Sequence, residues 1–285
     1  LALGFKPEPF AEAFPDNVHV LSSGRAVRVH YAVEPEPLDT GGAIAFAARH
    51  CGVDSTFVVA NGDIVTDLPV ADLVRAHREG GRHATIHLTP VPDPSAFGVV
   101  ECNGDGAVRR FVEKPAPGET DSNLINAGTY VFEPEVLDLI PVNARVSIER
   151  DTFPKLAAAN QLGGYATDDY WIDAGRPELF LTANLDLIDG TRGTPEPAVA
   201  STATLAPDAI VDRSVIGEHS VVGAGSELRG SVLLPNATVG RGSTIVGSIV
   251  AGEVGEGVSL TDCVIGPGYC VPAGTALTGE RLPAP

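Results

Sequence analysis

The sequence has no methionine among its 285 residues, and tryptophan occurs once. A chain that begins at Leu1 without Met is not a complete primary translation product, so we expect a segment to have been lost upstream. No run of about 18 uninterrupted apolar residues occurs, as a transmembrane helix would require. The N-terminal stretch LALGFKPEPF has neither a basic leader nor a long apolar core, so we expect no signal peptide. These absences predict a cytoplasmic protein with no membrane partner.

Basic residues are also scarce, with 19 against 37 acidic residues and a net charge of −18 at pH 7. Such a charge repels a phosphate backbone, which argues against nucleic acid as a partner. A small anionic substrate remains compatible, because a bound divalent cation and a few local cations reverse the field within a cleft. The cysteines form no C-x-x-C pair and have no histidine at zinc-ligand spacing, so we expect reduced, structural thiols at Cys51, Cys102, Cys263 and Cys270.

Short apolar runs alternate with helical patterns over residues 1–188, which is typical of an α/β layered domain. Runs of β-branched and aromatic residues that end at Asn and Gly turns mark its strands. Ser147 is placed to cap a helix whose first turn carries two acids. The clearest expected elements are strands at 56–60 and 126–132, a hairpin of 98–102 with 107–113, and a last helix at 176–188.

A Gly- and Pro-containing linker at 189–203 precedes a region of different composition, rich in Val, Ile and Gly. Apolar residues there recur every six positions, and Ile216, Leu233 and Val250 lie 17 residues apart, so each coil is one turn of a three-sided prism. Residues 204–280 therefore resemble a left-handed β-helix of hexapeptide repeats, with some four coils and one shortened coil near Val250. Its flat parallel faces predict homo-oligomerisation through the β-helix.

Two aspartates directly follow strands, where open α/β sheets gather ligand-binding groups. Asp63 ends the turn Asn-Gly-Asp after the strand at 56–60, and Asp173 lies in Y-W-I-D-A-G-R-P between a strand and a helix. Two such carboxylates are suited to Mg²⁺, which prefers carboxylate, water and phosphate oxygens. The alternative for each is an aspartate that stabilises a turn or caps the next helix, and position alone leaves both open.

Two further motifs suit phosphate and nucleotide chemistry. In F-V-E-K-P a lysine at the end of a hairpin strand can meet a phosphate while its acidic neighbour accepts sugar hydroxyls, and a surface ion pair is the alternative. P-L-D-T-G-G precedes a helix of small residues, where the backbone could approach a flat base closely, and a simple helix N-cap is the alternative.

The order of the motifs is more specific than any one of them. E-x-E-P-L-D-T-G-G, V-V-A-N-G-D, F-G-V-V, F-V-E-K-P, I-N-A-G-T-Y-V-F, S-I-E-R-D-T-F-P and Y-W-I-D-A-G-R-P follow one another along the chain. This succession resembles the sugar-1-phosphate nucleotidyltransferase family, particularly its GDP-mannose pyrophosphorylase branch, over nearly the whole chain. The resemblance implies a Rossmann-like domain with a mixed sheet, followed by a left-handed parallel β-helix. It also implies transfer of a nucleotidyl group from an NTP to a sugar 1-phosphate, with GTP and mannose 1-phosphate as the first choice.

The resemblance assigns roles to individual residues. Asp63 and Asp173 would bind Mg²⁺, Lys114 would contact the sugar phosphate, and other matched residues would hold the sugar or lie beside the base. Asp39 stands where many relatives carry glycine, which leaves the base preference open. The implied catalytic residues are Asp63, Lys114 and Asp173, and the implied substrate contacts are Thr40, Gly41, Gly98, Glu113 and Asn126.

The family's opening G-x-G-T-R-L-x-P-L-T-x-x-x-P-K loop does not occur in this sequence. Because that loop binds the triphosphate in the family, we expect the chain as given to lack a segment needed for full activity. Glucose-1-phosphate thymidylyl-, uridylyl- or adenylyltransferase activity is the nearest alternative, and a non-catalytic regulatory subunit that binds a nucleotide sugar is another. An acyltransferase would need a histidine base, and His219, the one histidine of the β-helix, is the only candidate.

Overall fold

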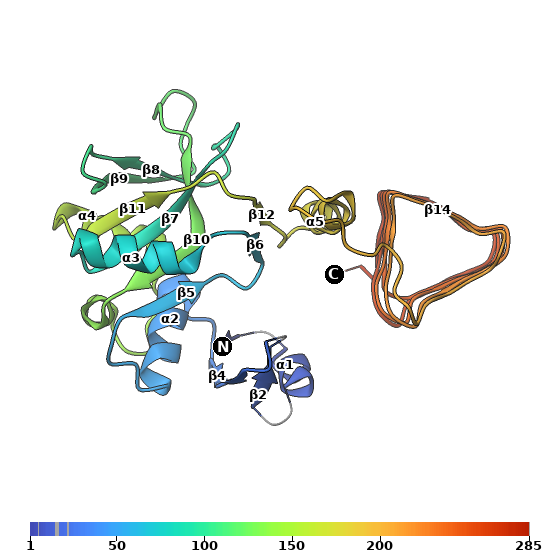
Figure 1. Ribbon diagram of the computed structural model, residues 1–285, viewed down its shortest axis with the longest axis horizontal. Helices are drawn as coiled ribbons and strands as arrows, with labels where there is room; N and C mark the ends of the chain where they lie inside the picture. Colours follow the sequence, from blue (N-terminus) through green and yellow to red (C-terminus); the bar gives the residue numbers. More distant parts are fainter. Residues whose placement is uncertain (5, 15–16, 22, 285) are drawn as a thin grey trace. The chain divides into compact units, whose positions relative to one another are not determined.

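The computed structural model describes residues 1–4, 6–14, 17–21 and 23–284. The chain forms two compact units, of which the first comprises residues 1–62 and 68–171 and the second residues 63–67 and 172–285 (Figure 1). The second unit therefore includes a short segment from the middle of the α/β sequence. Each helix within the described ranges is too short or too polar to cross a membrane.

The first unit is built on a six-stranded mixed sheet (Figure 1). Its central strand, β10, is antiparallel to β5, β7 and β8, whereas β11 runs parallel to β7. The predicted strands and the predicted hairpin, β8 with β9, are all present, so the expected mixed α/β domain is confirmed. The strands are β5 (Phe57–Ala60), β7 (Ala84–Pro90), β8 (Gly98–Cys102), β9 (Val108–Glu113), β10 (Leu124–Phe132) and β11 (Leu162–Ala166).

The core of this unit forms where β10 meets the helices. Tyr130 and Phe132 stack with their ring centroids 5.5 Å apart, and Phe153 packs edge-on against Tyr130 at 5.3 Å. All three side chains are buried, and each such burial stabilises the fold by about 1.5–3 kcal/mol. The other elements are α1 (Glu8–Ala13), α2 (Asp39–His50), α3 (Val70–Gly80), η1 (Pro134–Leu139), η2 (Ile148–Thr152) and α4 (Phe153–Ala158), with the strand pairs β1 (Ala2–Leu3) with β4 (Ala32–Val33) and β2 (Val18–Val20) with β3 (Ala26–Arg28).

The second unit contains the β-helix, whose triangular cross-section is visible in Figure 1. Three parallel sheets of five strands form its sides, so it has five coils where the repeat predicted some four. The repeat did not count the first coil, which contains β13 and β14, although its Leu205 and Val211 are six residues apart as in the other coils and pack against the β-helix core. Its strands are β13 (Thr204–Leu205), β14 (Ile210–Asp212), β15 (Val215–Ile216), β16 (Val221–Val222), β17 (Glu227–Arg229), β18 (Val232–Leu233), β19 (Thr238–Val239), β20 (Thr244–Val246), β21 (Ile249–Val250), β22 (Glu253–Val254), β23 (Ser259–Thr261), β24 (Val264–Ile265), β25 (Cys270–Val271), β26 (Ala276–Thr278) and β27 (Arg281–Leu282).

Polar ladders run inside the β-helix beside its apolar stacks. The hydroxyl of Ser214 accepts a hydrogen bond from the backbone N–H of Ser231 at 3.0 Å, and Ser231 in turn accepts from Ser248 at 3.2 Å. Ser248 accepts from the N–H of Cys263 at 3.0 Å, so a free, buried thiol ends the serine column. The ladder satisfies buried corner amides that would otherwise destabilise the coil.

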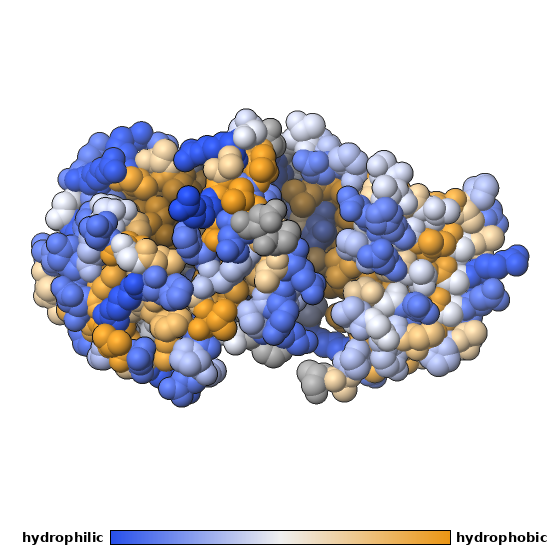
Figure 2. All heavy atoms as spheres, turned by 90° about the horizontal axis from the view of Figure 1, so that it is seen from below, coloured by the Kyte–Doolittle hydropathy of each residue, from blue (hydrophilic) through white to orange (hydrophobic). Residues whose placement is uncertain are grey.

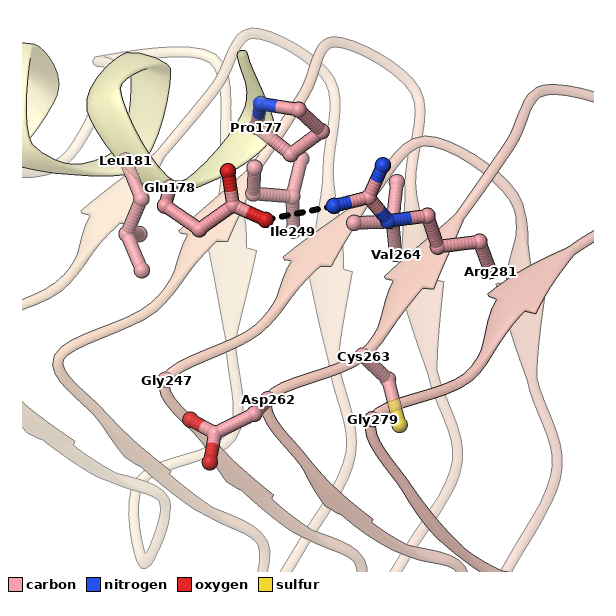
Figure 3. A pocket seen from close by; sticks show the side chains of 10 residues that line it. All are labelled: Pro177, Glu178, Leu181, Gly247, Ile249, Asp262, Cys263, Val264, Gly279 and Arg281. Atoms are coloured by element: carbon pink, nitrogen blue, oxygen red, sulfur yellow. Dashed lines mark hydrogen bonds and ion pairs between the residues drawn. The ribbon is translucent and has the colours of Figure 1, made fainter. Parts of the chain in front are cut away.

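Helix α5 (Pro177–Asp189) covers one side of the β-helix. Val232 and Ile249 point outward from that sheet, opposite to their inward neighbours, yet they are only 1% and 7% exposed. A cavity of about 350 Å³ lies beside Leu181 and Ile249, and Glu178 at the start of the helix forms an ion pair with Arg281 at its rim (Figure 3). The second unit is thus one packed body in which α5 belongs to the β-helix.

One histidine of the first unit is held neutral in the core. His87 on β7 is fully buried, its Nε2 lies 2.8 Å from the Thr167 hydroxyl, and its Nδ1 has no partner within the described ranges. Burial lowers the pKa of His87 from 6.5 to about 4, although the charge of Asp169 opposes this shift.

We expect this histidine to make the protein less stable in mild acid. Below pH 6.5 the unfolded chain protonates His87 while the folded chain does not, so the free energy of unfolding falls until the pH reaches about 4; above pH 6.5 the contribution is complete. In urea titrations at pH 7.5 and 5.0, His87→Gln should show a smaller difference between the two midpoints than the wild type. The exposed His50→Gln serves as control, and a wild-type pH difference in His87→Gln would contradict the assignment.

Candidate active site

A bulge in the central strand of the first unit lies beside the predicted sugar contact Asn126. Asn126 pairs with Leu88 and Tyr130 with Ile86, so β10 has two more residues than β7 over this stretch. Gly128 lies in the bulge with φ of 77°, a left-handed conformation that glycine adopts without steric cost. The sequence did not predict this bulge, although the glycine inside an otherwise regular strand was a signal for it.

The carbonyl groups of the bulge bind two other segments of the first unit. Gly128 accepts a hydrogen bond from the backbone N–H of Asn61 at 2.9 Å. Ala127 accepts one from the indole N–H of Trp171 at 2.9 Å, and the Trp171 ring packs edge-on against Phe97 with centroids 5.9 Å apart. Asn61 and Trp171 each stand two residues before one of the predicted metal ligands.

Those two predicted ligands, Asp63 and Asp173, lie together in the second unit. Strand β12 (Trp171–Asp173) pairs with β6 (Ile64–Thr66), and the N–H of Ala174 donates to the backbone carbonyl of Asp63 at 2.8 Å. The side chains converge on Gly175, because a Cβ there would lie 2.7 Å from Asp63 Oδ2 and 3.0 Å from Asp173 Oδ1. The structure thus brings together two residues that are far apart in the sequence.

The alternative roles considered for these aspartates were to stabilise a turn or to cap the next helix, and the structure shows only the first of them. Neither α3 nor α5 has a side-chain hydrogen bond at its N-cap, so neither aspartate caps the helix that follows it. Asp173 Oδ1 does accept a hydrogen bond from the N–H of Gly175 at 2.9 Å, which orients this carboxylate and leaves Oδ2 available. Asp63 is exposed. The Asp173 carboxylate therefore stabilises its own turn, and the Asp63 carboxylate faces the same position at Gly175.

The paired carboxylates fit a hard divalent cation. No cluster of three or more His, Cys, Asp or Glu side chains suited to a metal occurs within the described ranges. Mg²⁺ is commonly held by one or two carboxylates, with its remaining positions filled by water and substrate phosphate. Because residue 175 has no side chain, the space that both carboxylates face stays open. The donor set therefore suits an ion that arrives with a phosphorylated ligand.

Glu113 and Gly98 face each other across the predicted hairpin. They are register partners, and a Cβ at Gly98 would lie 2.9 Å from Glu113 Oε2, so the carboxylate lies over the backbone of residue 98. Lys114 follows with φ of 51°, and its N–H donates to the carbonyl of Phe97 at 2.9 Å. Neither Glu113 nor Lys114 forms an ion pair with another described residue, so the surface ion pair considered from sequence is not formed.

Thr40 and Gly41 are engaged by a different segment of the first unit. The Thr40 hydroxyl donates to Glu149 at 2.7 Å and accepts from the N–H of Ile148 at 2.9 Å. The N–H of Gly41 donates to the carbonyl of Val146, and a Cβ at this glycine would come within 3.0 Å of the same oxygen. Close packing against residues 146–149 therefore requires small residues here, independently of any bound base.

The neighbouring Asp39 has a backbone conformation that suits glycine, the residue that the family resemblance implies at this position. Its φ is 61°, a left-handed conformation in which aspartate is tolerated and glycine is favoured. Asp39 accepts a hydrogen bond from the N–H of Thr40 at 2.8 Å and pairs with Arg150 at 3.2 Å. Ser147 caps η2 as predicted, because its side chain accepts from the N–H of Arg150. The departure at Asp39 is thus accommodated by local contacts.

Comparison with known proteins identifies the class. Residues 7–190 match the nucleotidyl transferase family, and residues 185–266 match the GlmU-like C-terminal hexapeptide family. The chain therefore belongs to the nucleotidyl transferase family, and its C-terminal part is a left-handed β-helix of hexapeptide repeats.

The relatives include several with one activity in their names. The chain is 35% identical over 255 residues to a mannose-1-phosphate guanylyltransferase of Mycobacterium tuberculosis, covering 86% of this chain and 69% of that protein. It is 39% identical over 184 residues to a mannose-1-phosphate guanyltransferase of Yarrowia lipolytica, where it spans 64% of this chain and about half (49%) of the relative. Crystal structures of HddC from Yersinia pseudotuberculosis, one complexed with GMP-PN, match with a TM-score of 0.52 and 26% identity over 64% of this chain and 74–75% of theirs.

The convergence on Gly175 predicts that a methyl group there would disturb metal binding. In Gly175→Ala the new Cβ would lie too close to Asp63 and Asp173, so at least one carboxylate must move. We expect the affinity for Mn²⁺, measured by electron paramagnetic resonance titration, to fall about tenfold or more. Gly62→Ala is the matched control, because a Cβ at Gly62 meets nothing within 4 Å. Equal Mn²⁺ affinity of Gly175→Ala and the wild type would show that the ion does not bind there.

Proposed function

We propose that the protein transfers a guanylyl group from GTP to mannose 1-phosphate, giving GDP-mannose and pyrophosphate. The observation that carries the proposal is the convergence of Asp63 and Asp173 on the open position at Gly175, in a chain of the nucleotidyl transferase family. The choice of base and sugar rests on the relatives named mannose-1-phosphate guanylyltransferase, which are 33–39% identical to this chain.

The reaction is an in-line displacement at the α-phosphorus of the nucleotide. An oxygen of the sugar phosphate forms the new P–O bond, the bond to the bridging oxygen of the β-phosphate breaks, and pyrophosphate leaves. The attacking oxygen is already anionic, so neither a general base nor a covalent enzyme intermediate is required. Catalysis then depends on positioning and on stabilising negative charge.

Each candidate residue has a role in this proposal. Asp63 and Asp173 would hold Mg²⁺, and the bound ion would neutralise charge on the transferred phosphoryl group. Lys114, an exposed residue, would bind the phosphate of the sugar 1-phosphate through its ammonium group. The sugar would be held by the carboxylate of Glu113, the backbone of Gly98 and the amide of Asn126. Thr40 and Gly41 would form the wall beside the base, held by their contacts with residues 146–149.

Pyrophosphate release from different substrate pairs tests the proposed substrates. GTP with mannose 1-phosphate should react fastest in the full-length protein. Faster release from glucose 1-phosphate with dTTP, UTP or ATP would replace the proposed base and sugar but retain the reaction. Binding of GDP-mannose without turnover of any pair would instead favour a regulatory subunit.

Amide substitutions at the two aspartates test the proposed metal ligands. Asp63→Asn and Asp173→Asn keep the side-chain shape but remove a negative charge, so we expect turnover to fall by roughly two or more orders of magnitude with little change in thermal stability. Asp72→Asn, at a partly exposed acid of α3 paired with Arg75, is the control and should retain activity. Near-normal pyrophosphate release by either of the first two variants at saturating Mg²⁺ would refute their assignment.

We also propose that the β-helix mediates homo-oligomerisation. Apolar and polar side chains are mixed on its surface (Figure 2), and Ile210 and Val221 on two of its sides are 55% and 43% exposed. Flat parallel sheets of this kind can pack against a second copy.

Lysine at these positions should weaken such an assembly. Because a contact between flat faces would bury the added charges, Ile210→Lys with Val221→Lys should reduce the number of chains per particle in light scattering. Glu256→Lys, at an exposed corner turn, is the control for an added lysine. An unchanged particle mass in the double variant would place the contact elsewhere or show a monomer.

A further inference from the structure

The side-chain amide of Asn126 is held at both ends. Its Oδ1 accepts a hydrogen bond from the backbone N–H of Gly128 at 3.1 Å, and its Nδ2 donates to the hydroxyl of Tyr130 at 3.0 Å. A backbone N–H can only donate, so the amide atom that faces Gly128 must be the oxygen. The orientation of the amide is therefore fixed, and one N–H of Nδ2 remains free to bind a ligand.

The bulge in β10 makes this contact possible. In a regular strand the side chains of residues 126 and 130 would stand on the same face about 13 Å apart, since each residue advances by about 3.3 Å. The extra residues of β10 between its pairs with Leu88 and Ile86 shorten that separation to hydrogen-bonding distance. The glycine conformation at the bulge thus brings Tyr130 to Asn126.

Tyr130 is suited to act as a fixed support. Its side chain is 1% exposed, and its ring is packed between Phe132 and Phe153 in the core. Burial raises the pKa of its hydroxyl above the usual range, and the nearby charges of Glu149 and Glu113 raise it further, while the hydrogen bond from Asn126 opposes them. The hydroxyl therefore stays neutral at working pH and accepts from the amide without titrating.

We propose that Tyr130 is a positioning residue for sugar recognition, whose hydroxyl holds the Asn126 amide so that its free N–H binds a sugar hydroxyl. This inference rests on the proposed function, because it takes Asn126 as a contact to the sugar. Tyr130 itself is buried behind Asn126 and acts through it.

Calorimetric titration with GDP-mannose and with GDP separates the sugar from the nucleotide. Tyr130→Phe keeps the ring but removes the hydroxyl, so it should weaken GDP-mannose binding about 3- to 10-fold and leave GDP binding unchanged. Tyr165→Phe, which removes a hydroxyl from β11 in the same unit, is the matched control and should bind both ligands normally. Equal loss for GDP and GDP-mannose in Tyr130→Phe would indicate general damage and overturn the proposal.

A double-mutant cycle tests whether Tyr130 acts through Asn126. In an Asn126→Ala background, Tyr130→Phe should cause no further loss of GDP-mannose affinity, because the group that it positions is absent. Additive losses would show that Tyr130 contributes to sugar binding by another route, and would overturn the proposal.

A nuclear magnetic resonance measurement keeps this inference separate from the proposed function. The side-chain amide pair of Asn126 is assigned by its disappearance in Asn126→Ala. In Tyr130→Phe the proton that Nδ2 donates to the Tyr130 hydroxyl should move toward the shift of a free amide proton. An unchanged amide pair in Tyr130→Phe would overturn the positioning role whatever the ligand. Failure of GDP-mannose and mannose 1-phosphate to bind the wild type would refute the proposed function. It would also show that the Asn126 amide is not positioned for a sugar.

Discussion

The bulge at Gly128 is the constraint that holds Asn126, Asn61 and Trp171 in the first unit. The carbonyl groups of Ala127 and Gly128 in the bulge accept hydrogen bonds from Trp171 and Asn61. A regular β10 would place Tyr130 too far from Asn126 for a hydrogen bond. One left-handed residue in the central strand of the sheet is therefore linked to the contacts of three segments, each of which carries or precedes a candidate functional residue.

The sequence predicted the elements of the fold better than the contacts between them. The hairpin, the strands and the six-residue repeat follow local periodicity, which depends on side-chain alternation within one segment. The bulge does not follow local periodicity, because it is defined by the register of β10 against β7. The sequence pattern did not predict that these two strands pair. The serine column of Ser214, Ser231 and Ser248 has the same 17-residue spacing as the apolar corners, yet apolar periodicity alone did not reveal it.

The candidate site shows the same limit. Motif order singles out Asp63 and Asp173, and the structure brings both carboxylates to Gly175, a proximity that motif order alone did not give. At Thr40 and Gly41 the motif suggests a nucleotide contact, and the structure adds a packing requirement against residues 146–149 that favours the same small residues. A small residue beside a ligand and a small residue packed against a neighbouring backbone look alike in a sequence, because neither position has room for a larger side chain.

The charge of the protein gives the final link between composition and chemistry. With a net charge of −18, the average field of the chain repels phosphates, so a phosphorylated ligand must be bound by local groups. Lys114 is a cation without an ion-pair partner among the described residues, and a cation lodged by Asp63 and Asp173 would add positive charge where acids alone would repel the ligand. The acidic pair is thus compatible with an anionic substrate only through such an ion. Under the proposed function, metal and substrate would therefore bind as linked events.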